Sequence, residues 1–524
     1  MNVTLISEFS YLYMKAALLW HYVNAAAIFL IKENIYLMLE RSSGILLPIS
    51  SLPSRYGIGT LGKEAFDFVD FLHSCKQRYW QLLPMGPVSY GDSPYASFSV
   101  FAGNPYYIDL QALIEEGILA HKDCEVLNPD DEYVDYGKQF NYRYGILYKA
   151  FANSKEKYRC EINEFALKNQ WVHDYSLFMA LKYYNKQKPW YEWEEKIAER
   201  DREEIEKYRY ILKEEIEFWT FLQYVFYEQY YKVKNYARSK GVFLIGDIPI
   251  YTAEDSVEAW AEGRLFMNLV AGVPPDAFSD EGQLWGNPVY NWGYLRENSY
   301  EWWIKRLKWS LNLYDTVRID HFRGFDEFWA VERGSENAID GKWLPSEGRE
   351  LFNRAINEIK DLSIIAEDLG IITDSVVRLR KEFGFPGMKI LQFAFDGNPE
   401  NPYLPGNYEE NSVAYTGTHD NDTLKGWYEK LDKSVKKYVL KSLNISGHAE
   451  GDSIILSMIE KVLAGKSCLS IIPMQDYLCL CSEARMNVPS TLGGNWTWRL
   501  KKEMITQELS DKIKAVTVLS NRAK

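Results

Sequence analysis

The chain has 524 residues, of which 47% are hydrophobic and 25% charged, with 33 Gly and 19 Pro. These values exclude collagen, coiled-coil and wholly disordered proteins. A net charge of -13 argues against nucleic acid and anionic membrane surfaces as partners and suits a neutral substrate better. Aromatic residues make up 15% of the chain. Most of them should lie in the core, but such rings also stack on sugars.

Residues 1–37 are predicted to be an N-terminal extension outside the fold. The uncharged run 16–31 is shorter than the roughly 20 apolar residues of a membrane span, and its apolar character continues through Ala25-Ala26-Ala27, which resembles a signal-cleavage site. An over-extended translation start explains this segment best, and an amphipathic anchor is the alternative. The six cysteines form neither a CxxC pair nor a dense framework. We therefore expect reduced thiols, a cytoplasmic location and no membrane association.

From residue 41 onward, short apolar runs alternate with Gly/Pro/Asp-rich loops and helical stretches. This alternation is typical of βα units. Eight strands are predicted, at Ile45–Ile49, Tyr79–Leu83, Val242–Ile248, Thr316–Ile319, Leu362–Ala366, Ile390–Phe395, Ser412–Thr416 and Cys468–Pro473. Several are continuous aliphatic runs of the kind that are buried on both faces. The expected fold is an α/β, (β/α)8 TIM barrel that occupies residues 38–524.

A long charged stretch, residues 110–235, separates the second predicted strand from the third. Apolar and aromatic residues recur in it at helical spacing among Glu and Lys. We expect a mainly helical inserted subdomain that packs on the barrel as a lid or wall.

Four of the predicted strands run into acids at their carboxyl ends: Asp247, Asp320, Glu367 and Asp420. Active sites of (β/α)8 barrels form at the carboxyl ends of the strands. A single acid in such a place is more often a helix cap or a salt-bridge partner, but four on one rim indicate a site.

Arg318 and Asp320 should point to the same side of their strand, because side chains alternate along a strand. A neighbouring cation keeps a carboxylate ionised. An ionised Asp beside a separate Glu is the pair that a retaining glycosidase needs, one as nucleophile and one as proton donor.

Three other chemistries have weaker support. His321 and His419 could bind a metal with nearby acids, but no HxH or HExxH spacing occurs. The glycine clusters 57–59 and 493–494 lack nucleotide-binding spacing and are interpreted as turns, and no GxSxG elbow is present. We expect neither a metal nor an organic cofactor.

Many segments between about residues 41 and 500 resemble the amylomaltase family of 4-alpha-glucanotransferases, also called disproportionating enzymes. The matching segments, in order, are 51–59, 90–106, 246–250, 271–276, 282–288, 318–324, 366–370, 415–423 and 482–487. They include Gly-Asp-Ile-Pro-Ile, Arg-Ile-Asp-His-Phe-Arg-Gly, Ala-Glu-Asp-Leu-Gly and Thr-Gly-Thr-His-Asp-Asn-Asp. So many motifs in one order make chance agreement implausible.

The resemblance implies a role for each matching position. Asp320 is the expected nucleophile, Glu367 the general acid/base and Asp420 the third carboxylate, which holds sugar hydroxyls. Arg318 and His419 are expected to support them, and Asp247 has a structural or subsite role. Loop residues expected to line the glucan groove are Tyr90, Ser93, Tyr95, Gln283 and Trp285.

The implied reaction moves a segment of an α-1,4-glucan to glucose or another α-1,4-glucan, so the partners are these glucans, maltooligosaccharides and glucose. A retaining mechanism predicts a separation of about 5–5.5 Å between the carboxyl groups of Asp320 and Glu367. An α-amylase-type hydrolase would use the same acids. Two further hypotheses are an inactive glucan-binding protein and a metal-dependent hydrolase, and the oligomeric state stays open.

One segment departs from the family pattern. The ten residues 261–270 stand where the family usually has a longer loop near the substrate groove. The shorter segment could alter the preferred chain length of the substrate or weaken binding of the acceptor.

Overall fold

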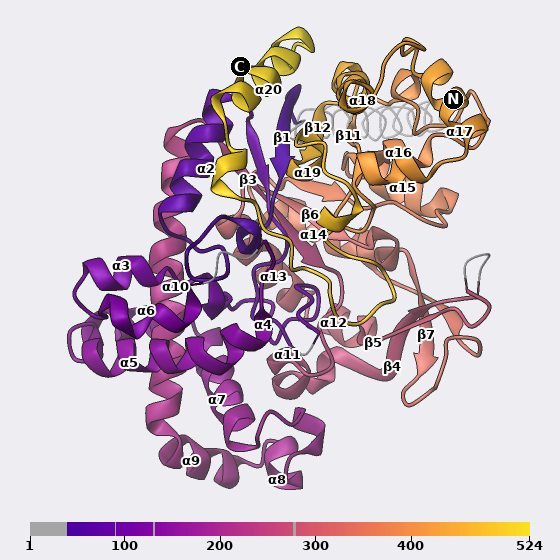
Figure 1. The fold of residues 1–524 in the computed structure, drawn as a ribbon. Helices are drawn as coiled ribbons and strands as arrows, with labels where there is room; N and C mark the ends of the chain where they lie inside the picture. Colours follow the sequence, from indigo (N-terminus) through magenta and orange to yellow (C-terminus); the bar gives the residue numbers. More distant parts are fainter. Residues whose placement is uncertain (1–38, 90, 129–131, 276–278, 524) are drawn as a thin grey trace, which may run out of the picture.

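Eight parallel strands close into a barrel in the computed structural model, which describes residues 39–89, 91–128, 132–275 and 279–523 (Figure 1). The order around the barrel is β1-β12-β11-β10-β9-β6-β3-β2. The strands are β1 (Ser42–Leu46), β2 (Tyr79–Gln81), β3 (Phe243–Pro249), β6 (Thr316–Asp320), β9 (Ile364–Ala366), β10 (Gly387–Ile390), β11 (Ser412–Tyr415) and β12 (Leu469–Pro473). The predicted (β/α)8 fold class is confirmed. The predicted extension, residues 1–37, lies outside the described residues.

The prediction of a strand at Ile390–Phe395 is wrong. The strand β10 ends at Ile390, and Leu391–Phe393 forms a 3-10 helix. An apolar run does not by itself show where a strand starts. Here the carboxylate of Asp368 fixes the strand by accepting the N–H of Met388, and a Cβ at Gly387 would meet that carboxylate. The strand β1 likewise begins and ends three residues before its predicted bounds, because Pro48 and a 3-10 helix follow it.

Helices fill the long interval between β2 and β3. They are α3 (Leu110–Glu115), α4 (Tyr136–Lys138), α5 (Tyr144–Ser154), α6 (Arg159–Lys168), α7 (Trp171–Tyr184), α8 (Glu195–Ala198), α9 (Arg202–Ile211) and α10 (Lys213–Ser239). Figure 1 shows most of them, in purple to magenta, on one side of the barrel. The long helix α10 also contacts the barrel strand β3, and Tyr230 on α10 donates to the carbonyl of Leu313, the last residue of α13 (Glu301–Leu313), at 2.6 Å.

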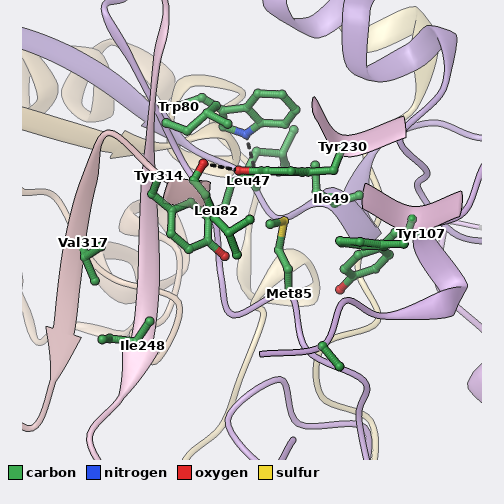
Figure 2. Close-up of a cluster of buried hydrophobic side chains, with 14 of the residues drawn as sticks. Leu47, Ile49, Trp80, Leu82, Met85, Tyr107, Tyr230, Ile248, Tyr314 and Val317 are labelled. Carbon is green, nitrogen blue, oxygen red and sulfur yellow. Dashed lines mark hydrogen bonds between the residues drawn. The ribbon is translucent and has the colours of Figure 1, made fainter. Parts of the chain in front are cut away.

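The core continues from the barrel strands into this helical layer. Figure 2 shows Trp80 of β2, Val317 of β6 and Tyr230 of α10 in one cluster of buried side chains. The indole N–H of Trp80 donates to the carbonyl of Leu47 at 2.8 Å, so its polar atom is satisfied inside the apolar cluster. The helical segment is therefore packed on the barrel.

A second sheet was not predicted from the sequence. Its four antiparallel strands lie in the order β5-β4-β7-β8 and comprise β4 (Phe266–Val273), β5 (Gln283–Tyr290), β7 (Glu327–Glu332) and β8 (Lys342–Pro345). The sheet extends from the lower right of the barrel in Figure 1. The strands β4 and β5 come between β3 and β6, and β7 and β8 come between β6 and β9, so two barrel connections build this sheet together.

The remaining helices complete the outer layer of the barrel and its connections. They are α2 (Lys63–Ser74), α11 (Val257–Ala261), α12 (Trp292–Glu297), α13 (Glu301–Leu313), α14 (Gly348–Glu358), α15 (Asp374–Glu382), α16 (Leu424–Lys430), α17 (Lys433–Ser442), α18 (Asp452–Ala464), α19 (Met474–Tyr477) and α20 (Gln507–Leu519). Within the described ranges, no helix is both long enough and apolar enough to cross a membrane.

Candidate active site

The register of three neighbouring strands brings the predicted acids to one rim. Asp247 on β3 pairs with Arg318 on β6, and Ile319 on β6 pairs with Ala366 on β9. The next residue along each of β6 and β9 is therefore Asp320 and Glu367, respectively. Parallel strands end at the same side of a barrel, so these side chains share the carboxyl-terminal rim.

Arg318 connects two of the acids. Its Nη1 atom lies 2.7 Å from Oδ1 of Asp247, and its Nη2 atom lies 3.0 Å from Oδ1 of Asp320. Burial alone would lower the pKa of Arg318, but the two carboxylates raise it well above its ordinary value. The guanidinium therefore stays charged between them. Arg318 and Asp320 point to the same side of their strand, as expected from the alternation of side chains.

Glu367 sits beside Asp320 with both carboxylate oxygens held by the backbone. The N–H of His321 donates to Oε2 at 2.6 Å, and the N–H of Leu369 donates to Oε1 at 2.9 Å. Burial, followed by the negative charge of Asp320, raises the pKa of Glu367 to about 8. Glu367 therefore carries a proton at neutral pH and can act as an acid.

Asp420 follows β11 and is kept ionised by its neighbours. Burial alone would raise its pKa, but His419, 3.3 Å away, and Asn487, which donates to Oδ1 at 2.6 Å, together lower it. The pKa of His419 is raised by Asp420 against the opposing effect of burial. Asp420 therefore favours the charged form of the His419 imidazole.

Tyr95 joins the Asp420 side of the rim to the Arg318 side. Its hydroxyl donates to Oδ2 of Asp247 at 2.9 Å and lies 2.9 Å from Nε2 of His419. Its ring stacks on the imidazole of His419 with a centroid distance of 5.1 Å. Burial and the charge of Asp247 raise the pKa of the Tyr95 hydroxyl well above its ordinary value, so it stays protonated as a donor.

Gln283 and Trp285 do not lie in a loop, as expected from the Gly and Pro residues around them, but on strand β5. Trp285 is 37% exposed and packs edge-on against His321, with ring centroids 4.8 Å apart. Its indole N–H donates to Gln283 at 3.2 Å. The second sheet therefore brings an exposed indole to the rim beside the residue that follows Asp320.

Of the remaining predicted site residues, one supports the loop that carries Tyr95 and one lies outside the described residues. The Ser93 hydroxyl accepts the N–H of Tyr95 at 3.3 Å, so it supports the loop that carries Tyr95. Tyr90 lies outside the described residues.

His321, weighed above as a metal ligand, packs on Trp285, and burial lowers its pKa to about 4. No group of three or more His, Cys, Asp or Glu residues in the described part of the chain is arranged to hold a metal ion.

Two residues at the rim were not identified from the sequence. Asn487 binds Asp420, and it belongs to the last matching motif, which was a usable signal. Trp496 packs against both Tyr95 and His419 at a centroid distance of 5.8 Å from each. It follows the Gly493-Gly494 turn, whose residues have φ values of 79° and 73°. No spacing in the sequence links Trp496 to the acids.

Most of the segment 261–270 lies in helices and a strand, so it adds little loop structure. It holds the last residue of α11, a 3-10 helix at Gly263–Leu265 and the first five residues of β4.

Comparison with known proteins gives the family. The sequence profile of the 4-alpha-glucanotransferases matches residues 47–506. A 4-alpha-glucanotransferase from Clostridium butyricum is 48% identical over 485 residues, which cover 90% of this chain and 99% of the relative. One from Thermus thermophilus is 42% identical and covers 92% and 99%, respectively.

A solved structure agrees with the sequence matches. The amylomaltase from Streptococcus agalactiae, in complex with acarbose, superposes with a TM-score of 0.90 at 41% identity, over 93% of this chain and all of that one. These findings confirm the resemblance seen in the motifs. The chain therefore belongs to the 4-alpha-glucanotransferase family and is an enzyme of that type.

Proposed function

We propose that this enzyme moves a segment of an α-1,4-glucan from a donor chain to glucose or another α-1,4-glucan through a covalent glucosyl intermediate. One observation carries the residue assignment. Asp320, paired with the buried cation Arg318, stands beside Glu367, whose pKa is about 8. When the environments of two carboxyl groups move their pKa values apart, one group can serve as nucleophile and the other as acid.

In the first step, Asp320 attacks the anomeric carbon while Glu367 donates its proton to the departing glycosidic oxygen. The bond to the leaving glucan breaks, and a β-glucosyl ester of Asp320 forms. In the second step, Glu367, now ionised, removes the proton of an acceptor hydroxyl, which attacks the same carbon and releases Asp320. Two inversions give net retention, and the proton returns to Glu367.

The other rim residues bind and orient the sugar. Asp420, ionised by His419 and Asn487, is suited to accept hydrogen bonds from hydroxyls of the sugar that reacts. Tyr95, beside His419, and Trp285, beside His321, offer aromatic surface near the acids, and Gln283 supports Trp285. Tyr90 and Ser93 complete the proposed glucan groove on the basis of the motif alone.

Transfer requires that a sugar acceptor outcompete water for the intermediate. The aromatic residues around the rim favour this outcome, because stacking holds a sugar where water would otherwise lie. An α-amylase-type hydrolase would use the same acids and differs only in this competition. The family membership favours transfer.

Incubation with maltotriose tests the proposal. Transfer predicts glucose plus longer maltooligosaccharides at a constant number of reducing ends, because each bond broken is replaced by one formed. A rise in reducing ends without longer products would establish a hydrolase. Binding without any turnover would establish a glucan-binding protein, and activity lost on chelation would establish a metal-dependent enzyme.

A cytoplasmic location belongs to the same proposal. All six cysteines are free thiols, and Cys75, Cys124 and Cys479 among them are buried. Unpaired thiols in these numbers suit a reducing compartment.

A further inference from the structure

A groove with an aromatic lining lies on the outer wall of the barrel, away from the acids. It has a volume of about 780 Å³ and lies between α13 on one side and the start of α7 on the other, with α11 and α12 at its end. This volume falls within the range of about 300–1,000 Å³ that small-molecule sites occupy. None of the residues that line it belongs to the rim described above.

The helix α13 presents two different aromatic faces. One face packs into the barrel core through Trp303, Ile304 and Leu307, which are buried. The other face carries Trp302, Lys305 and Trp309, at spacings of three and four residues, and this face lines the groove. Trp302 and Trp309 are seven residues apart, about 10.5 Å along the helix axis. A single sugar ring cannot contact both, whereas an oligosaccharide can.

Contacts below the groove hold these indoles rigid while leaving part of each ring accessible. Trp302 packs against Tyr290 and Trp303 at centroid distances of 5.5 and 5.6 Å, and Trp309 packs against Trp171 at 5.5 Å. Each of the three tryptophans that line the groove is half-buried. Rings fixed in advance lose little conformational entropy when a ligand stacks on them.

The polar lining matches a neutral, hydroxyl-rich ligand. Three lysines, Lys168, Lys305 and Lys308, line the surface of the groove together with three acids, Asp174, Glu262 and Glu301. A fourth acid in the lining, Glu258, is buried, and burial raises its pKa to about 7. Asn169, Asn298 and Asn312 each donate an amide N–H to the protein, which orients the side-chain carbonyl. Such carbonyls accept hydrogen bonds from hydroxyls.

We propose that this groove is a second binding site for an α-1,4-glucan chain, separate from the reaction at the rim. The inference rests on the proposed glucan substrate. A second anchoring point increases the effective concentration of a long glucan at the rim but gives little to a substrate too short to reach both sites.

The test measures binding of maltoheptaose by calorimetry in Asp320→Asn protein, which should not turn the sugar over. We expect two classes of site in this background. Adding Trp302→Ala should weaken the groove site about tenfold, the ratio that corresponds to 1.4 kcal/mol, so that only the rim site is still resolved as a class. In the otherwise native enzyme, Trp302→Ala should lower the ratio of kcat/KM for amylose to kcat/KM for maltotriose. Tyr210→Ala, which removes an aromatic ring that is 85% exposed on α9 outside the groove, is the matched control.

Circular dichroism and the melting temperature establish that each variant folds. If Trp302→Ala does not fold, Ala261→Trp, which adds bulk at the end of α11 inside the groove, replaces it and should remove the same class of site. Two unchanged classes of site in the folded groove variant, or a single class in Asp320→Asn protein, would overturn the inference. A wild-type enzyme that does not disproportionate maltotriose would instead overturn the proposed function.

Discussion

The rim of the barrel and the outer groove use opposite chemistry on the same protein. At the rim, the buried Arg318 bridges the buried Asp247 and the half-buried Asp320, and burial together with the charge of Asp320 favours the protonated form of Glu367. In the groove, half-buried indoles lie among charges of both signs. Carboxyl groups in unlike environments can act as acid and nucleophile, the two roles that the reaction needs. Aromatic surfaces that stack on a sugar only hold a neutral ligand. The rim should therefore respond steeply to single changes of charge, and the groove should not.

The largest effect is expected from Asp320→Asn, which removes the nucleophile but keeps the shape of the side chain. The rate of maltotriose disproportionation should fall by about four orders of magnitude or more, while maltooligosaccharide binding persists. Steady-state kinetics and calorimetry measure the two quantities. Asp361→Asn, at an exposed position where Asn tolerates the φ of 59°, is the control. A near-normal rate in Asp320→Asn would show that another residue is the nucleophile.

Glu367→Gln should lower the rate about 10²–10⁴-fold, because a general acid/base is lost. A donor whose leaving group needs no proton, such as an α-glucosyl fluoride, should restore the first step. In the unmodified enzyme the rate should fall as the pH rises through about 8, because Glu367 then gives up the proton that the leaving oxygen needs. Glu400→Gln, at an exposed site, should retain this pH limb. A rate that stays flat well above that pH would contradict the assignment of Glu367 as the acid.

Arg318→Lys should lower the rate about 100-fold and also the melting temperature. A lysine has one point charge where the guanidinium contacts two acids, so one carboxylate is left buried without its partner. Kinetics and thermal unfolding monitored by circular dichroism measure both effects, with the exposed Arg202→Lys as the matched control. If Arg318→Lys kept the wild-type rate and melting temperature, the ion network would be dispensable.

Asn487→Asp should reduce kcat about 10-fold, the cost of losing a hydrogen bond to a charged group and replacing it with repulsion. The second carboxyl group would lie against Asp420, which accepts the Asn487 amide at 2.6 Å. The pKa of Asp420 should rise, so activity should also be lost at a higher pH on the acid side than in the wild type. The exposed Asn353→Asp is the control. An unchanged acid limb would separate Asn487 from the function of Asp420.

The smallest effect is expected at the groove when salt is added. Raising the ionic strength from about 0.1 M to about 1 M should change the affinity of the groove for maltoheptaose by less than about twofold, because salt screens charges and the proposed ligand has none. Calorimetry with Asp320→Asn protein makes this measurement. A steep loss of affinity with salt would mean that an ionic ligand belongs in the groove, and the contrast with the rim would then disappear.

The sequence by itself determined the barrel and most of its rim. Most of the predicted strands coincide with barrel strands over the greater part of their length, because strands buried on both faces leave continuous aliphatic runs that few other structures require. The rule that parallel strands end on one side then placed Asp247, Asp320, Glu367 and Asp420 on a common rim. The strand β1 was shifted along the chain, and β10 was misplaced because its bounds depend on Asp368, a residue that follows another strand.

Only the tertiary structure decided the features that depend on contacts between distant segments. The antiparallel sheet that carries Trp285 is built from two separate connections, and its central pair, β4 with β7, joins segments that lie on either side of β6 in the chain. Trp496 follows a glycine turn and packs against Tyr95, and no local sequence pattern predicts that contact. The proton on Glu367 is likewise a tertiary property, since burial and the proximity of Asp320 raise its pKa. Local periodicity fixes which residues face a core, but the position of one element against another follows from packing the whole chain.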